Sequence, residues 1–429
     1  MSDISVRSSL TFMSDTYDIT HSTAPPEARR TEDCAMTPPE RNVTTGWKLP
    51  DEYEMLRDTV RRFMQQEVGP VEDTLPHDAT EPAPADLARL RSRARALGLW
   101  CVQSPAEYGG AGLDLLGQCI VAEEAAKCRM GLYFPAAGAF GQDPPLVIFA
   151  GSRHLAEKYG IPAIERGSKT FIAISEPSGG SDPARAIATR AERKGDRYVL
   201  NGAKMWISGI DAADWGVLFA RTGARGDRGG ITAFVVDPKR AGLRLQRIGV
   251  MRSYQPFEVF LDDYEVPVED RIGEEGEGFK LADRWLVHAR VPYAAASLGV
   301  AQAALALAID WARQRETFGS LLSERQAIQW MIADSEMELR ASRLLTWQAA
   351  WNGDLGQDIK VDASMAKVLA TETAHRVLDR AMQVMGGLGV SHALPLERWY
   401  RELRIRRIGE GPSEVQRMVI ARALLSGGR

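Results

Sequence analysis

The segment from Arg406 to Pro412 (Arg-Arg-Ile-Gly-Glu-Gly-Pro) holds the carboxylate of Glu410 between two glycines. Gly409 and Gly411 leave little side-chain bulk beside Glu410, so a ligand can approach its backbone closely. Pro412 indicates a helix start, since proline suits the first turn of a helix. Nearby arginines can balance the charge of a carboxylate or of a ligand phosphate. These arginines are Arg404, Arg406 and Arg407. Taken alone, the segment fits a reactive carboxylate and a plain surface turn equally well.

Two further segments offer contacts to an anion or to a flat ring. Ser175 to Asp182 (Ser-Glu-Pro-Ser-Gly-Gly-Ser-Asp) follows a short β-like run, and its N–H groups can contact an anion or a ring edge. Lys204 to Ser208 (Lys-Met-Trp-Ile-Ser) carries Trp206, whose face can stack on a planar ring. Most loops like Ser175–Asp182 are simple turns without a ligand. A Trp in a strand, such as Trp206, is usually part of the hydrophobic core. For each segment, ligand contact and a purely structural role both remain open.

Two motifs fall at the ends of long helical stretches. The first is Arg315-Glu316-Thr317-Phe318-Gly319, with Gln326 beyond it, and the second is Gln383-Val384-Met385-Gly386-Gly387. Glycines at these points are typical of helix C-caps. Arg315 can also supply the bidentate cation that a pyrophosphate needs.

Several function classes lack support in the sequence. There is no G-x-G-x-x-G at a strand-to-helix turn and no Walker A sequence, so neither a Rossmann NAD site nor a P-loop is indicated. The six histidines have no metal-ligand spacing, so we expect no metal. A net charge of -4 gives no reason to expect nucleic acid or an anionic membrane as partner. No apolar run approaches the roughly 18 residues of a membrane span.

The four cysteines show no C-x-x-C spacing and are few for a chain of 429 residues. They are Cys34, Cys101, Cys119 and Cys128. Reduced thiols are the simplest interpretation, and they favour a cytoplasmic location.

The length exceeds that of one compact core, and the sequence pattern changes twice along the chain. Residues 1–46 are rich in Ser, Thr and Pro and are predicted to be a disordered leader. We expect a helical domain over 47–168, a small β-barrel or sandwich domain over 169–275, and a four-helix-bundle domain over 276–429. The predicted fold class is therefore α+β and multidomain.

Three local predictions follow from the pattern. The first helix runs from Asp51 to Val68, with Asp51 as its N-cap. Asn201-Gly202 forms a hairpin turn between two strands. Pro292 kinks the first bundle helix. The bundle helices are expected over Phe279–Glu316, Ser323–Trp351, Ile359–Met385, Pro395–Ile405 and Pro412–Leu425.

The motifs above, in this order, resemble the FAD-dependent acyl-CoA dehydrogenase family over roughly Leu49 to Leu425. The family carries its catalytic base in a Glu-Gly-Thr-Ser-Glu-Ile-Gln-Arg-like run, which places the base at Glu410. The chain departs from the family at Pro412, where Thr is usual, and at Gly409, where an aromatic residue is common. It resembles a divergent member with a Gly-Glu-Gly-Pro segment.

The resemblance implies roles for residues in each motif. Ile174, through its backbone, and Ser175 would hydrogen-bond the flavin ring of FAD, while Trp206 packs on it and Ser208 bonds near its reactive nitrogen. Ser181 and Gly411 would contact the acyl-CoA substrate. A third set would bind the pyrophosphate and adenosine of FAD held by a neighbouring subunit, which implies a homotetramer built as a dimer of dimers. This set is Arg315, Thr317, Phe318, Gln326, Gln383, Gly386 and Gly387.

The implied reaction is α,β-dehydrogenation of an acyl-CoA thioester, as in fatty acid metabolism, with an electron-transfer flavoprotein as acceptor. Glu410 would take the α-proton while the β-hydrogen leaves as hydride to flavin N5. The backbone N–H of Glu410 would help to stabilise the enolate, and Arg290 would orient the base or balance its charge. Some members carry the base on the kinked helix instead, at a position that is Ala289 here.

Three alternatives stand beside this prediction. An acyl-CoA oxidase, or another flavoenzyme of the same fold such as a desulfinase or a reductase, would retain most of these motifs. A non-catalytic binding or assembly subunit would lose the base or the flavin contacts.

Burial should raise the pKa of Glu410, whereas the helix start at Pro412 should lower it, and the sequence alone leaves the balance open.

Overall fold

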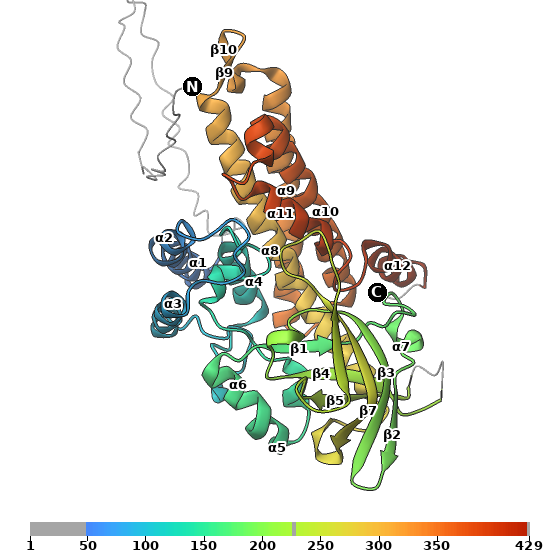
Figure 1. The fold of residues 1–429 in the computed structure, drawn as a ribbon. Coiled ribbons are helices and arrows are strands. Elements are labelled where there is room, and N and C mark those ends of the chain that lie inside the picture. The colour runs from blue at the N-terminus through green and yellow to red at the C-terminus, as the bar shows by residue number, and fades with distance from the viewer. Residues whose placement is uncertain (1–48, 225–228, 427–429) are drawn as a thin grey trace, which may run out of the picture. The chain divides into compact units, whose positions relative to one another are not determined.

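The computed structural model describes residues 49–224 and 229–426 (Figure 1). The described residues from Leu49 onward form one compact unit. The predicted disordered leader, residues 1–46, and Cys34 lie outside the described residues. Within the unit, helices come first, a β-sheet follows, and long helices complete the chain. This order confirms the predicted α+β fold class.

Six helices make up the first part of the unit. They are α1 (Asp51–Phe63), α2 (Gly69–Glu72), α3 (Pro84–Ala96), α4 (Leu115–Ala125), α5 (Arg153–Leu155) and α6 (Ile161–Arg166). The helix predicted to run to Val68 is α1 followed by the π-helical turn Met64–Val68. The predicted N-cap is wrong, because Pro50 holds that position and Asp51 begins the helix. An acidic residue suits the first turn, where the helix dipole favours negative charge.

The start of α4 is fixed by carboxylates from two parts of the chain. Asp114 caps the helix by accepting a hydrogen bond from the N–H of Gly117 at 2.8 Å. Asp354, at the end of α9 (Gln326–Asp354), accepts the N–H groups of Leu115 and Leu116 at 2.7 and 3.0 Å. These N–H groups have no partner within their own helix, so Asp354 ties α4 to the bundle.

The middle part is a mostly antiparallel sheet with strand order β6-β7-β3-β2-β4-β5-β8, and β1 pairs in parallel with β4. Tyr198 of β3 and Phe234 of β5 touch across one core, with ring centroids 4.9 Å apart, although their strands are not neighbours. The sheet therefore folds over on itself, as a sandwich does. The strands are β1 (Thr170–Ala173), β2 (Arg190–Lys194), β3 (Arg197–Ile207), β4 (Trp215–Arg221), β5 (Ile231–Val236), β6 (Leu243–Arg247), β7 (Phe257–Pro267) and β8 (Arg271–Ile272), with the short helix α7 (Pro183–Ala186) between β1 and β2.

The predicted hairpin at Asn201-Gly202 is wrong. β3 runs straight through these residues, and its pairing with β7 shifts register between Leu200 and Gly202. The Asn201 side chain bonds the backbone N–H of Asp263 on β7 at 2.8 Å. Asn-Gly suits both a tight turn and a β-bulge, since both need a residue with unusual φ. The real hairpin joins β2 to β3 through residues 195 and 196.

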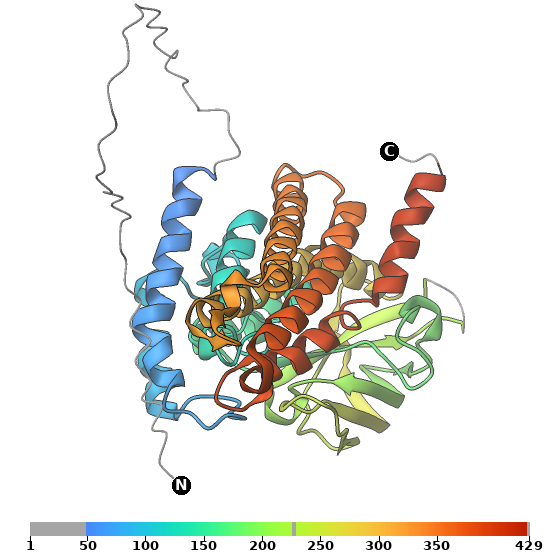
Figure 2. The same cartoon turned by 90° about the horizontal axis from the view of Figure 1, so that it is seen from above.

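Three long helices form the bundle and run side by side in Figure 2. They are α8 (Gly278–Gln314), α9 and α10 (Lys360–Met385). The hairpin of β9 (Glu316–Thr317) and β10 (Ser320–Leu321) joins α8 to α9, and α11 (Leu396–Arg406) and α12 (Ser413–Leu425) follow α10. α8 continues through Pro292. Gly353 and Asp354, predicted to separate the second and third bundle helices, lie in the last turn of α9, and the helix ends just after them.

Helix α8 is long and apolar enough, by length and composition, to cross a membrane. The expectation that no apolar run reaches this length is therefore wrong. The most apolar 18-residue window of α8 is 67% buried inside the protein. Its many alanines pack against α4 and α10 in the largest core cluster, so the apolar character serves the bundle.

The two glycines of the β2–β3 region give a matched test of the corrected strand. A Cβ at Gly202 would lie 2.7 Å from the Cα of Thr189, whereas a Cβ at Gly195 would meet nothing within 4 Å. Both residues have positive φ, so each Ala substitution costs about 1 kcal/mol of backbone strain. Gly202→Ala should lose about 1–3 kcal/mol more through the clash.

Differential scanning calorimetry of Gly202→Ala and Gly195→Ala checks this prediction. We expect the melting temperature to fall clearly further for Gly202→Ala. Equal losses would mean that Asn201-Gly202 is an open turn after all.

Candidate active site

A cavity of about 2170 Å³ lies among the N-terminal helices, the sheet and the bundle. A typical small-molecule site measures roughly 300–1,000 Å³, so this cavity has room for more than one ligand. Its lining includes many of the residues that the sequence singled out. These residues are Ile174, Ser175, Ser181, Trp206, Ser208, Arg290, Glu410 and Gly411.

Glu410 sits in a strained turn between α11 and α12. Its φ is 55°, and that of Gly411 is 91°, so two successive residues adopt left-handed backbone. A non-glycine residue in this region costs about 1–3 kcal/mol, and such strain concentrates at functional sites. No described residue accepts a hydrogen bond from the N–H of Glu410, so this donor is available to a ligand.

Two buried cations hold this turn by its carbonyl groups. Arg290 of α8 donates from Nε to the carbonyl oxygen of Glu410 at 2.9 Å. Lys367 of α10 donates from Nζ to the carbonyl oxygens of Gly411 at 2.8 Å and of Arg407 at 3.2 Å. The two cations thus donate hydrogen bonds to carbonyl groups that lie beyond the end of α11. Lys367 was not singled out from the sequence, although a lysine among the alanines of a long helix is a usable signal.

The electrostatics of Glu410 have two opposing parts. Burial in the cavity wall raises the pKa of its carboxyl above the ordinary value, while the charges of Arg290, Arg406 and Lys367 lower it. The net shift is upward. A carboxylate with a raised pKa accepts a proton more readily, which suits a general base.

Another part of the cavity wall presents an aromatic face with hydroxyl groups nearby. Trp206 has a φ of 66° at the irregular end of the β3–β7 pairing, and its residue surface is 53% exposed. Ser208 follows it and accepts a hydrogen bond from Nη2 of Arg252 at 2.7 Å. Gly180 lies so close to Ser175 that a Cβ on Gly180 would be 3.2 Å from the Ser175 Oγ. An exposed indole beside hydroxyls and a glycine-lined loop fits the flat, polar-edged ring of a flavin.

A buried ion pair behind this face holds the two segments together. Lys204 donates to Oε1 of Glu176 at 2.7 Å and to the carbonyl oxygen of Ile174 at 3.1 Å. Glu176 also accepts the N–H groups of Ala188 and Thr189. Glu176 and Lys204 therefore position the loop and the strand, a role that sequence reasoning did not assign to either.

The structure does not bring the third predicted set to this cavity. None of Arg315, Thr317, Phe318, Gln326, Gln383, Gly386 and Gly387 is among the residues that line it. They lie around the β9–β10 hairpin and the end of α10, towards the same end of the bundle, and all except Thr317 are exposed (Figure 1). Phe318 at the hairpin tip is completely exposed, at 101%.

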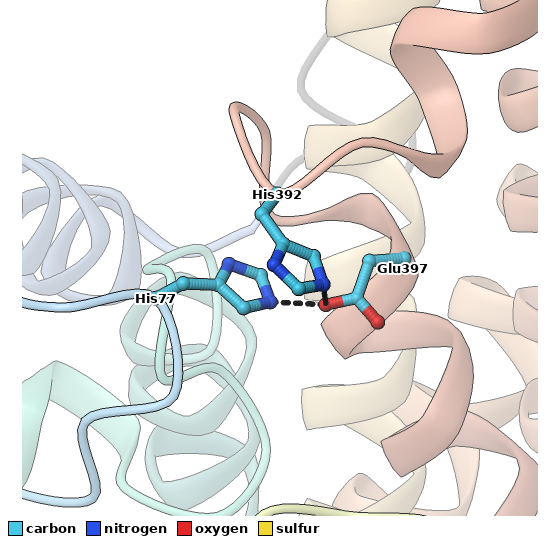
Figure 3. Close-up of side chains that lie close together, drawn as sticks. All are labelled: His77, His392 and Glu397. Atoms are coloured by element: carbon cyan, nitrogen blue, oxygen red, sulfur yellow. Dashed lines mark hydrogen bonds and ion pairs between the residues drawn. The ribbon is translucent and has the colours of Figure 1, made fainter.

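A histidine cluster lies elsewhere, between the loop after α2 and α11. Figure 3 shows His77 and His392 stacked, with ring centroids 4.0 Å apart, and both directed at Glu397. Their ligand atoms lie within 4.8 Å of one another, a proximity that the sequence spacing hides. Glu397 also accepts two hydrogen bonds from Arg401, each of 2.9 Å. Because Arg401 already balances the carboxylate, we assign the cluster to packing, and the expectation of no metal stays a prediction.

Comparison with known proteins places this geometry in a family. The chain matches the models for the N-terminal, middle and C-terminal domains of acyl-CoA dehydrogenases over residues 50–166, 171–263 and 276–425. It is similar to the 3-(aryl)acrylate reductase of Clostridium sporogenes, with 36% identity, covering 87% of this chain and 99% of that protein. It also shares 36% identity with the mitochondrial short-chain specific acyl-CoA dehydrogenase of Bos taurus, over 89% of this chain and 92% of the other.

Solved structures agree. A chain from the structure described as the electron transferring flavoprotein of Acidaminococcus fermentans superposes with a TM-score of 0.79 and 32% identity. The match covers 89% of this chain and 99% of that one. The present chain belongs to the acyl-CoA dehydrogenase family.

Proposed function

We propose that Glu410 is the base in the FAD-dependent dehydrogenation of acyl-CoA thioesters that this chain catalyses. The observation that carries the proposal is the turn at Glu410. It places a carboxylate of raised pKa in the wall of the large cavity and leaves the N–H of the same residue without a partner among the described residues.

The proposed chemistry needs a base and a donor close together. The Glu410 carboxylate takes the proton from the α carbon, and the electrons of that C–H bond form the new double bond. Charge develops on the thioester oxygen during this step, and a preorganised donor there is worth about 3 kcal/mol. The free N–H of Glu410 is our candidate donor. Bound FAD supplies the acceptor for the hydride that leaves the β carbon, at its N5 atom.

Arg290 and Lys367 are proposed as positioning residues. Both bond carbonyl oxygens of the turn and neither bonds the carboxylate of Glu410. They hold the base in place while leaving its oxygens free to accept a proton. Trp206, Ser175, Ile174 and Ser208 are the residues that we expect to hold the flavin ring. Ser181 and Gly411 are the expected substrate contacts.

Reduction of a 2-enoyl thioester is the second candidate, because the relative named 3-(aryl)acrylate reductase is 36% identical. The same residues serve either direction, since Glu410 would then return a proton to the α carbon. Whether the chain dehydrogenates or reduces its substrate depends on whether its protein partner accepts or donates electrons. We propose an electron-transfer flavoprotein, supported by the likeness to the A. fermentans structure.

We further propose a homotetramer, a dimer of dimers. Four large apolar residues repeat every seven positions along α9 and are all exposed. Such a row forms one apolar stripe on a helix and suits a second copy of the chain. The stripe consists of Trp330, Met337, Leu344 and Trp351. The exposed residues around Phe318 and Gly386 would then reach the FAD of a neighbouring subunit.

A cytoplasmic location is proposed on the cysteines alone. Cys101, Cys119 and Cys128 are free and buried. Reduced thiols of this kind are typical of proteins that stay in a reducing compartment. The domain limits 47–168, 169–275 and 276–429 are likewise our proposal.

Substitution of the base gives the direct test of the proposed function. Glu410→Gln removes the proton acceptor while keeping the shape, so anaerobic flavin reduction by acyl-CoA should slow at least about 100-fold. The bound FAD spectrum should persist. Stopped-flow spectroscopy with a panel of acyl-CoA thioesters measures both.

The control is Glu414→Gln, an exposed glutamate on α12 that does not line the cavity. It should reduce at nearly the wild-type rate. Undiminished flavin reduction in Glu410→Gln would remove Glu410 as the base.

Assembly is tested by placing a charge on the α9 stripe. Met337→Asp, at a residue that is 62% exposed, should shift the protein to smaller species, because an aspartate desolvated at an interface is unfavourable. The control is Met55→Asp on α1, where Met55 is 64% exposed. Size-exclusion chromatography with light scattering reports the mass of each variant. Identical masses for both variants and wild type would count against α9 as the interface.

A further inference from the structure

Tyr293 brings a phenol hydroxyl to the cavity directly beside the proposed base. It lies on α8, three residues after Arg290, and lines the cavity. A Cβ built on Gly409 would be only 2.8 Å from the Tyr293 hydroxyl oxygen. The hydroxyl therefore occupies the space that any side chain at position 409 would need. Gly409, the residue before Glu410, is what makes room for Tyr293.

The ring of Tyr293 is held in this position. The guanidinium of Arg406 lies over it, 3.8 Å from the ring centroid. Arg406 is fixed in turn by hydrogen bonds to the carbonyl oxygens of Tyr293 at 3.3 Å and Leu132 at 2.6 Å. A cation over an aromatic face is favourable by about 0.5–2 kcal/mol, so the ring has one preferred orientation.

The hydroxyl itself has no partner among the described residues. The hydrogen bonds that Tyr293 accepts go to its carbonyl oxygen, from Ser297 and Arg406, and the residue is half-buried in the cavity wall. Burial also raises the pKa of Tyr293 well above its usual value, so the group stays protonated and remains a donor. The hydroxyl is not among the buried polar atoms without a partner, so water in the cavity can reach it. A ligand that displaces this water must supply an acceptor, because a donor left without one costs about 1–3 kcal/mol.

On the basis of the proposed function, we propose that the Tyr293 hydroxyl binds an oxygen atom on the acyl chain of the substrate. The preferred substrates are then acyl-CoA thioesters that carry a neutral oxygen acceptor, a ketone or a hydroxyl, within a few bonds of the thioester carbonyl. The distance is short because Tyr293 adjoins Gly409, whose neighbour Glu410 must reach the α carbon. Tyr293 is thus a specificity-determining residue.

The surrounding charges favour a neutral acceptor over a carboxylate. The charges of Glu410 and Glu402 raise the pKa of the Tyr293 hydroxyl, whereas those of Arg406 and Arg252 lower it. Arg406 is already bonded to two carbonyl oxygens, and Arg252 is bonded to Ser208 and paired with Glu402 at 3.8 Å. Neither Arg406 nor Arg252 is therefore free to receive a second anion, which the charges of Glu410 and Glu402 would repel.

The test compares three acyl-CoA thioesters with five-carbon chains: pentanoyl-CoA, 4-oxopentanoyl-CoA and glutaryl-CoA. Stopped-flow flavin reduction gives kcat/KM for each, in wild type and in Tyr293→Phe. We expect wild type to prefer 4-oxopentanoyl-CoA over pentanoyl-CoA, and Tyr293→Phe to lower that ratio at least about tenfold. Gly409→Ala should lower it too, because the new Cβ displaces the hydroxyl.

Tyr254→Phe is the matched control, since Tyr254 lines the same cavity and stacks on Tyr133 at 3.8 Å. It should leave the ratio unchanged. Equal effects of Tyr293→Phe on the oxo and the alkyl thioester would overturn the inference and leave the proposed function standing. A wild-type preference for glutaryl-CoA would overturn the neutral acceptor. No flavin reduction by any of the three would overturn the proposed function together with the inference.

Discussion

The active-site turn depends on cations that reach it from two bundle helices. Arg290 from α8 bonds the carbonyl of Glu410, and Lys367 from α10 bonds those of Arg407 and Gly411. Left-handed backbone at Glu410 is unfavourable by itself, so surrounding contacts must hold it. The packing of α8 against α10 therefore sets the position of the base. The alanine-rich core of the bundle serves this placement.

Burial and charge act on Glu410 in opposite directions, and their balance suits the proposed reaction. A freely solvated carboxylate is a weak base at neutral pH, whereas a buried one without cations would be too costly to ionise. The structure keeps the cations on the backbone of the turn and near the carboxyl without a direct ion pair. The carboxyl stays ionisable while its pKa lies above the ordinary value.

Sequence patterns were sufficient for the order of helical, β and helical parts, because each element has its own hydrophobic period. They also indicated parts of the cavity wall, since Ser175, Trp206 and Glu410 lie in compact motifs. What they could not give are contacts between distant segments. Lys367 with Gly411, Arg406 with Tyr293, and His77 with Glu397 are examples of such contacts. The error at Asn201-Gly202 has a different origin, because one dipeptide serves both a turn and a bulge.

The pH dependence of kcat/KM tests the central claim most directly. The base must be ionised to act, so the rate rises with pH until the pKa of Glu410 is passed. Because burial outweighs the cations, the acid limb in wild type should lie above pH 4.5, the ordinary value for a glutamate. Lys367→Met removes a charge that favours the ionised form, and should move the limb to higher pH. A limb at or below pH 4.5, or one that moves down in Lys367→Met, would contradict the account.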